Sequence, residues 1–172
     1  MITFSSMKNL IIFFVFISSL NINQDSFEFS KKGLTPKETT IFYSNSTSEK
    51  IFYRISSWIE SNKKKLRFEI NKSEKNKSID FTVTSVDVRY SRTKSYYPKV
   101  YLKIDINDEE LVLTPYKIEL KKNSKYDMGW KELNLEQPYV FFKGKKGNKK
   151  LFLNKIAQCL NELKSEIEKC IN

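Results

Sequence analysis

The spacing of apolar residues predicts an amphipathic helix followed at once by a strand within residues 46–70. The apolar side chains of the first part form one stripe at the helical period: Ile51, Phe52, Ile55, Trp58 and Ile59. Ser46 is the expected N-cap, and Glu49 three residues later would complete a capping box. From Leu66 onward apolar and polar residues alternate, as they do in a half-buried strand. The stretch therefore predicts a helix whose apolar face covers a sheet.

Further segments with a two-residue period predict that this sheet is antiparallel. The expected strands cover residues 38–43, 66–71, 79–90, 100–106 and 111–120. A change of phase near Thr84 and Ser85 predicts a β-bulge. Pro115 predicts an edge strand, because proline has no N–H to donate to a neighbour. Residues 91–98 are expected to form a loop tip.

The last part of the chain predicts a second helix. Its apolar residues recur three or four positions apart: Leu153, Ile156, Leu160, Leu163 and Ile167. We expect this helix to lie on the sheet of a monomer, with a dimer seam as the alternative. Because the helices flank the strands instead of alternating with them, the chain is expected to be α+β. The expected architecture is a single antiparallel sheet of about five strands, in the order βαββββ…α, with two helices packed on it.

The N-terminus predicts export. Lys8 precedes eight apolar residues, 10–17, and a short polar segment, which together are typical of a signal peptide over residues 1–23. The apolar run is shorter than the roughly 20 residues that span a bilayer. We expect cleavage near Asn21 or Asn23 and a periplasmic or secreted product, with an uncleaved anchor as the alternative. Residues 24–37 are expected to be a lead-in, and 38–172 the domain, with 121–150 poorly defined by pattern.

Composition narrows the classes of function. The net charge is +11, but it comes from 27 Lys and only 4 Arg. Arginine is the usual side chain for bidentate phosphate and base contacts, so we expect no nucleic-acid partner and favour a Lys-rich soluble surface. The chain has no His, the commonest general base and metal ligand. It also has no Gly-rich phosphate loop, nucleophile elbow or CxxC motif. We therefore predict no enzymatic activity, no catalytic or metal-binding residues and no cofactor.

Two segments carry candidate binding residues. Tyrosines lie among cations in the expected loop, a composition typical of surfaces that stack sugars or bases: Arg92, Lys94, Tyr96 and Tyr97. The alternative is that these tyrosines pack against the rest of the fold. A basic turn at 143–150 adds Lys143, Lys145 and Lys146. Together these residues are the predicted binding surface.

Cys159 and Cys170 both belong to the last predicted helix. Eleven residues of helix separate two residues by about 16 Å, whereas the Cα atoms of a disulfide lie within about 7 Å of each other. We therefore expect two unpaired thiols that behave as small buried apolar groups, with an intermolecular bridge as the alternative.

The element order resembles a family of exported proteins from Gram-negative bacteria, a domain of unknown function with a TBP-like fold. The resemblance rests on Tyr53 and Trp58-Ile59 in the first helix, and on the strand 100–106 before the turn Asn107-Asp108. It covers roughly residues 38–120, with 151–171 as the closing helix. The family has no established activity, so it implies no functional residues, and the fold name does not imply DNA binding.

These observations predict an uncharacterised exported protein that acts as a non-enzymatic binding or scaffold domain at the cell envelope, with an unknown partner there. One alternative is an enzyme or inhibitor that acts on envelope polymers. The other is an electrostatic binder, with weak contact to an anionic membrane surface or polysaccharide through residues 143–150 and 63–65.

Overall fold

A computed structural model describes residues 26–126, 128–144 and 147–172. Its main sheet has seven antiparallel strands, of which five lie side by side in the order β3-β8-β7-β5-β4. These five are β3 (Thr39–Phe42), β4 (Phe68–Glu74), β5 (Ser78–Thr84), β7 (Ser95–Ile106) and β8 (Glu110–Lys122). The short strands β6 (Val88–Arg89) and β9 (Trp130–Leu133) pair with β7 and β8 respectively. The predicted α+β architecture is confirmed, and the sheet is larger than the five strands expected.

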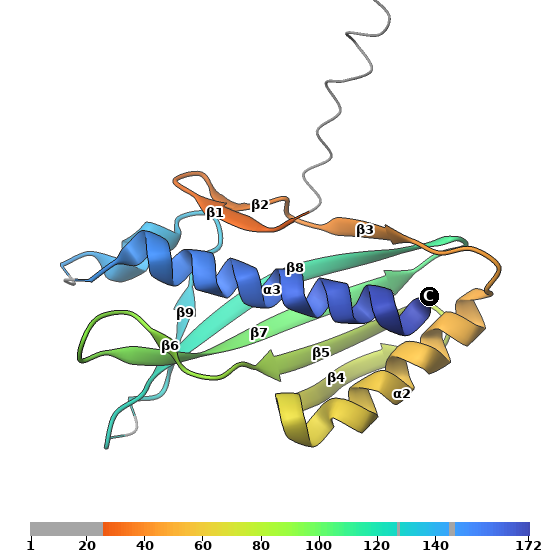
Figure 1. Cartoon of the computed structure of the whole chain (residues 1–172), viewed down its shortest axis with the longest axis horizontal. Helices are drawn as coiled ribbons and strands as arrows, with labels where there is room; N and C mark the ends of the chain where they lie inside the picture. The colour runs from red at the N-terminus through yellow and green to blue at the C-terminus, as the bar shows by residue number, and fades with distance from the viewer. Residues whose placement is uncertain (1–25, 127, 145–146) are drawn as a thin grey trace, which may run out of the picture.

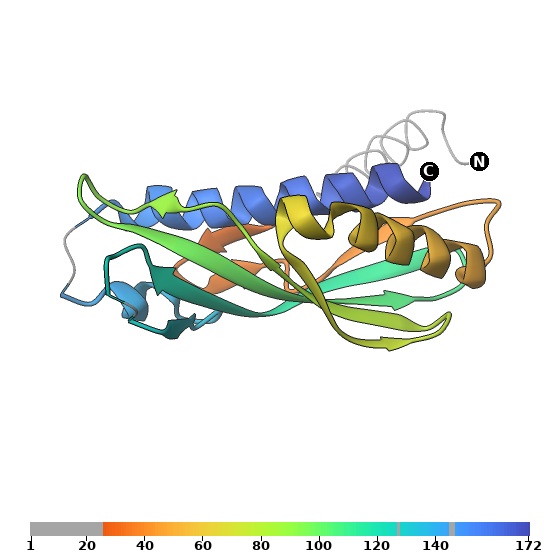
Figure 2. The same cartoon turned by 90° about the horizontal axis from the view of Figure 1, so that it is seen from below.

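Both α-helices of the described residues cover the same face of this sheet. Figure 2 shows α2 (Ser48–Leu66) and α3 (Lys149–Ile171) above the strands, whose opposite face is uncovered. The stripe residues Ile51, Ile55 and Ile59 are buried, as predicted. Along β7 every second residue from Tyr96 to Ile106 is buried under the helices, while the residues between them point to the uncovered face.

The end of α2 differs from the prediction. Thr47, and not Ser46, is the N-cap, because its hydroxyl accepts a hydrogen bond from the Lys50 N–H at 3.4 Å. The helix includes Leu66, where the strand was expected to begin, and ends where Arg67 takes the left-handed conformation, with φ 47°. Strand β4 starts only at Phe68. Phe68 is the one buried residue of this strand, because β4 lies at the edge of the sheet and is bulged after Ile70.

The predicted strand 79–90 is two strands. β5 ends at Thr84 and β6 begins at Val88, and both pair with β7. The phase change near Thr84 therefore marks a break and not a bulge. Pro115 does not lie on an edge strand, because β8 pairs with β3 along 110–113 and with β9 along 118–121. Pro115 occupies the interval between these two partners, where no donor is needed.

Residues expected to be a lead-in join the core. They form a hairpin of β1 (Glu28–Ser30) and β2 (Gly33–Thr35), and Phe27, Phe29 and Leu34 are buried. Asn161 of α3 holds the start of this hairpin: its Oδ1 accepts from the Phe27 N–H at 2.7 Å and its Nδ2 donates to the Phe27 carbonyl at 3.0 Å. The predicted signal peptide lies outside the described residues. In the part of the chain that the structure describes, no helix is both long and apolar enough to cross a bilayer.

Candidate functional site

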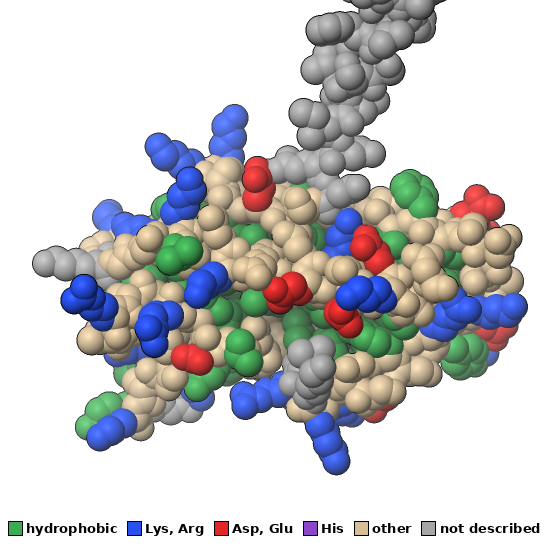
Figure 3. Space-filling model, viewed as in Figure 1, with side chains coloured by type: hydrophobic (Ala, Val, Ile, Leu, Met, Phe, Trp, Pro, Cys, Tyr) green, Lys and Arg blue, Asp and Glu red, His purple; other side chains and the backbone are tan. Residues whose placement is uncertain are grey.

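The fold brings the two predicted binding segments to one end of the molecule. Figures 1 and 2 both place the β6–β7 turn, the β8–β9 loop and the turn before α3 at this end. Lys and Arg side chains gather there (Figure 3). We call this region the basic end and define it by Arg92, Lys94, Lys122, Lys125, Lys131 and Lys143.

The basic end contains a pocket of about 210 Å³. Lys94 from the turn before β7, Lys122 of β8 and Lys131 of β9 line it. Its other lining residues are mainly apolar: Tyr96, Leu120, Met128, Gly129 and Phe141. The strand register explains the convergence, because Tyr96 pairs with Lys122 and Leu120 with Lys131, so these residues share one face of the sheet. We call it the three-lysine pocket.

Within the described ranges, the three ammonium groups form no ion pair with a carboxylate. Among the described residues, no carboxylate lies within 4 Å of the Nζ of Lys94, Lys122 or Lys131. Burial raises the pKa of the Tyr96 phenol, so this side chain stays neutral at ordinary pH. The pocket is therefore positively charged over an apolar floor, a combination suited to an anion that also carries an apolar part.

A cluster of buried aromatic rings supports the floor of the pocket. Phe142 of the 3₁₀-helix η1 (Pro138–Phe142) stacks on Tyr90, with centroids 4.9 Å apart, and Phe141 meets Tyr96 edge-on at 5.9 Å. Phe152 of α3 contacts Tyr90, Tyr96 and Phe142 at 5.5–5.7 Å. These rings link four separate segments, so packing fixes the geometry of the basic end.

The turn before α3 is tied to the same cluster. A Cβ on Gly147, whose φ is +155°, would lie 2.5 Å from the Tyr90 ring, so only glycine allows this approach. The next residue, Asn148, donates its N–H to the Tyr90 carbonyl at 3.3 Å and caps α3 by accepting from the Leu151 N–H at 2.9 Å. The cap thereby anchors the loop beside the pocket.

The predicted binding residues have different positions in the fold. Lys94 and Tyr96 line the pocket, but Tyr96 is only 6% exposed, so the predicted loop-tip stacking surface is wrong for this residue. The reason is that β7 already begins at Ser95 and directs Tyr96 under the helices. Tyr97 is half-buried and paired with Lys121 on the uncovered face. Arg92 and Lys143 are exposed at the basic end, and Lys145 and Lys146 lie outside the described residues.

Sequence reasoning missed two of the pocket lysines. Lys122 and Lys131 belong to residues 121–150, where the spacing of apolar residues predicts no defined element, and β9 is only four residues long. Their role depends on the pairing of β8 with β9, which no local sequence pattern specifies.

The uncovered face of the sheet carries charges that are already paired. Tyr101 donates to Glu119 at 2.6 Å, and Lys117 forms an ion pair with Glu119 at 2.8 Å. Burial and the hydrogen bond to Glu119 raise the pKa of Tyr101 to about 12. The Lys99 ammonium lies over the Trp130 ring, 4.8 Å from its centroid. Because these charges neutralise one another, the uncovered face attracts a charged partner less strongly than the three-lysine pocket does.

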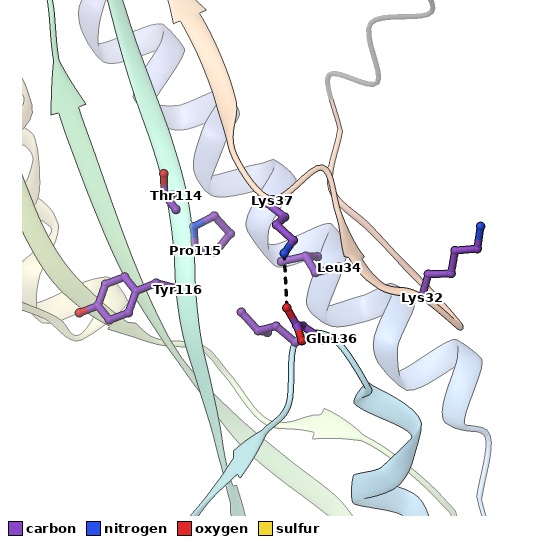
Figure 4. A pocket seen from close by; sticks show the side chains of 8 residues that line it. Lys32, Leu34, Lys37, Thr114, Pro115, Tyr116 and Glu136 are labelled. Atoms are coloured by element: carbon purple, nitrogen blue, oxygen red, sulfur yellow. Dashed lines mark hydrogen bonds and ion pairs between the residues drawn. The ribbon is translucent and has the colours of Figure 1, made fainter.

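A second cavity, of about 300 Å³, lies between the β1–β2 hairpin and β8 (Figure 4). Leu34, Pro115 and Leu135 contribute apolar lining, and the ion pair of Lys37 with Glu136, at 3.4 Å, spans its rim. Figure 4 shows the Lys32 and Tyr116 side chains extending away from the gap between them. The cavity occupies the interval of β8 between its partners β3 and β9, and it gathers no set of groups that suggests a reaction.

A third feature is an open groove beside α3, of about 510 Å³, which gathers two carboxylates, Glu28 and Glu162. Neither is buried, and Glu162 already accepts a hydrogen bond from Gln158 at 2.9 Å. Acid–base pairs in enzymes usually hold one carboxyl group in an apolar environment, which the groove does not provide. Within the described residues, no three His, Cys, Asp or Glu side chains are placed to hold a metal ion.

Comparison with known proteins places the fold. No protein-family model and no curated protein sequence matches the chain. A crystal structure of a TBP-like protein from Parabacteroides distasonis is similar to it, with 19% identity and a TM-score of 0.60 over 78% of this chain and 90% of that one. A DUF4468 family protein from Bacteroides ovatus is also similar, with 10% identity and a TM-score of 0.56 over 78% and 84%. This chain therefore has a TBP-like α+β fold.

Proposed function

We propose that this protein is an exported, non-enzymatic domain that binds an anionic partner at the cell envelope through the three-lysine pocket. The observation that supports the proposal is the convergence of Lys94, Lys122 and Lys131 on one apolar floor without a neighbouring carboxylate among the described residues. Three cations that share a small pocket repel one another, and an anion bound between them relieves that repulsion. The pattern of residues 1–23 supports export.

The proposal excludes catalysis and nucleic-acid binding for separate reasons. The chain contains no His, and the groove with two carboxylates holds neither of them in a buried position. On the broad uncovered face, where a long polymer could lie, Asp80 and Glu119 lie beside the lysines, so the face has little net positive charge to attract phosphates. We therefore expect this protein to be a monomer that binds its anionic partner at the basic end.

A binding measurement with dextran sulfate tests the proposal. We expect binding at low salt that weakens as salt increases, because exposed charges are screened. The variant Lys94→Gln/Lys122→Gln/Lys131→Gln should bind about 10- to 100-fold more weakly, since an exposed charge pair contributes roughly 0.5–1 kcal/mol. The matched control Lys72→Gln/Lys75→Gln/Lys77→Gln removes the same charge from the β4–β5 hairpin at the other end of the sheet (Figure 1).

The two variants decide the outcome together. If both lose binding equally, net charge and not the pocket is responsible. If the protein does not bind dextran sulfate even at low salt, the proposed function is wrong.

A further inference from the structure

We infer that the partner of the basic end is the surface of an anionic phospholipid membrane, with a head-group phosphate in the three-lysine pocket. This inference rests on the proposed function and adds an observation about apolar side chains. Tyr126 is 78% exposed, Met128 53% and Val140 60%. Single exposed apolar side chains are common on protein surfaces, whereas several that gather beside one pocket mark a candidate contact with a partner.

These apolar residues belong to the two segments that line the pocket from the β8–β9 loop and η1. Met128 lines it, Tyr126 lies two positions before Met128 in the β8–β9 loop, and Val140 precedes the lining residue Phe141 in η1. The basic end thus presents apolar side chains from two separate segments around one cluster of cations. Figures 1 and 2 show that the loops carrying them reach the same end, so a flat surface could contact them together.

A membrane uses both features, whereas a soluble polysaccharide uses only one. Each lysine near an anionic lipid surface increases the binding constant by a factor of about five. Aromatic and aliphatic side chains enter the boundary between head groups and acyl chains. A polyanionic sugar would engage the lysines but leave Tyr126, Met128 and Val140 in water. The combination therefore favours a lipid surface.

The long lysine side chains also suit this geometry. Their methylene stems can lie along the apolar floor of Tyr96 and Leu120 while the ammonium groups point toward phosphate. Binding by this end would leave the uncovered sheet face and the groove beside α3 directed away from the lipid. The domain could then hold a further partner, as a scaffold does.

Cosedimentation with phosphatidylcholine vesicles, with and without phosphatidylglycerol, tests the inference. We expect binding that depends on phosphatidylglycerol. The measured signal is the difference in binding between the two vesicle types, so the apolar segment of residues 1–23 does not contribute if it binds both types equally. The variant Lys94→Gln/Lys122→Gln/Lys131→Gln should lose about 100-fold, the product of three factors of about five. All three side chains are at least partly exposed, so the fold should persist, and circular dichroism checks it.

A second variant separates lipid from soluble polyanion. Tyr126→Ser/Val140→Ser should weaken vesicle binding several-fold and leave dextran sulfate binding unchanged, because neither side chain lines the pocket and only a lipid boundary contacts them. Phe42→Ser is the matched control: Phe42 is 72% exposed but lies on β3, away from the pocket, and its replacement should leave vesicle binding unchanged.

Several results would overturn the inference. Binding to dextran sulfate but not to phosphatidylglycerol vesicles would refute the membrane surface and leave the proposed function standing. Binding to neither would refute both. Equal binding to the two vesicle types, or no effect of Tyr126→Ser/Val140→Ser on vesicle binding, would show that the pocket and its apolar border do not contact lipid together.

Discussion

Replacing Phe152 with alanine should be among the most destabilising changes at the basic end. The Phe152 side chain is 0% exposed and lies in the first turns of α3. Its ring centroid is 5.6 Å from that of Tyr90, 5.7 Å from Tyr96 and 5.5 Å from Phe142. Phe152→Ala removes a surface that all three neighbours contact, and a cluster drawn from four segments cannot easily close the resulting cavity.

The expected cost follows from the burial. A buried phenylalanine removes about 150–250 Å² from water, and at roughly 25 cal/mol per Å² this corresponds to about 4–6 kcal/mol, of which alanine retains a small part. Measured Phe→Ala changes in protein cores cost about 3–5 kcal/mol. We therefore expect a loss of about 4 kcal/mol in the free energy of unfolding. For a chain of this length, that lowers the Tm by roughly 8–16 °C.

Leu151→Ala is the matched control, because Leu151 is the preceding residue of the same helix and is 50% exposed. Alanine is a good helix former, so this change should cost less than about 1 kcal/mol. Urea unfolding followed by far-UV circular dichroism measures both variants. If Phe152→Ala and Leu151→Ala differ by less than about 1 kcal/mol, the aromatic cluster does not hold this end together.

Four other changes have defined outcomes. Asn161→Ala removes both hydrogen bonds to the backbone that leads into β1 and should cost about 1–3 kcal/mol in urea unfolding, while a loss below that range would show that the hairpin docks without them. The pKa of Tyr101 rises from 10.0 to about 12 on folding, so between these pH values the folded state keeps a proton that the unfolded state loses. The contribution of Tyr101 to the free energy of unfolding should therefore fall by about 2 kcal/mol as the pH rises from about 10 to about 12, and Tyr101→Phe should show a shallower fall in stability. Cys159 and Cys170 are free thiols whose pKa burial raises, so both should react slowly with a thiol reagent at neutral pH, and non-reducing electrophoresis should show no shift unless they bridge two chains. Sequencing the N-terminus of the exported protein should show a start near Gln24, whereas recovery of the first methionine would refute cleavage.

The elements that sequence could predict are the long ones. The helical period of α3 persists over 23 residues, and the two-residue period of 100–106 predicts the second half of β7, although residues 95–98, expected in a loop, also belong to this strand. The same signal predicts the buried stripe of α2. Short strands are harder to predict, because a strand of two to four residues contains at most two repeats of the apolar–polar alternation. The β1–β2 hairpin and β9 were missed for this reason, and β6 was joined to β5 in one predicted strand, whereas four-residue β3 was predicted.

The pocket could be predicted only in part. The sequence shows cations and tyrosines before β7 and more lysines in the segment after β8, but nothing in it pairs Leu120 with Lys131. Tyr96 illustrates the limit: its neighbours Arg92 and Lys94 suggest an exposed loop, whereas its register on β7 buries it. A contact made by tertiary pairing has no local pattern, so the site becomes visible only when the strands are placed.

The distribution of charge argues that the basic end is more than a consequence of a lysine-rich composition. A bias toward lysine would place these residues all over the surface, and each would tend to find an acidic neighbour where acidic residues are common. Away from the basic end several lysines do have such a partner, as Lys77 pairs with Glu74, Lys103 with Asp105, and Lys117 with Glu119. Lys94, Lys122 and Lys131 instead share one pocket without a carboxylate partner among the described residues. Composition explains how many lysines the chain has, whereas the convergence of three of them on one pocket is the observation on which the proposed anion binding rests.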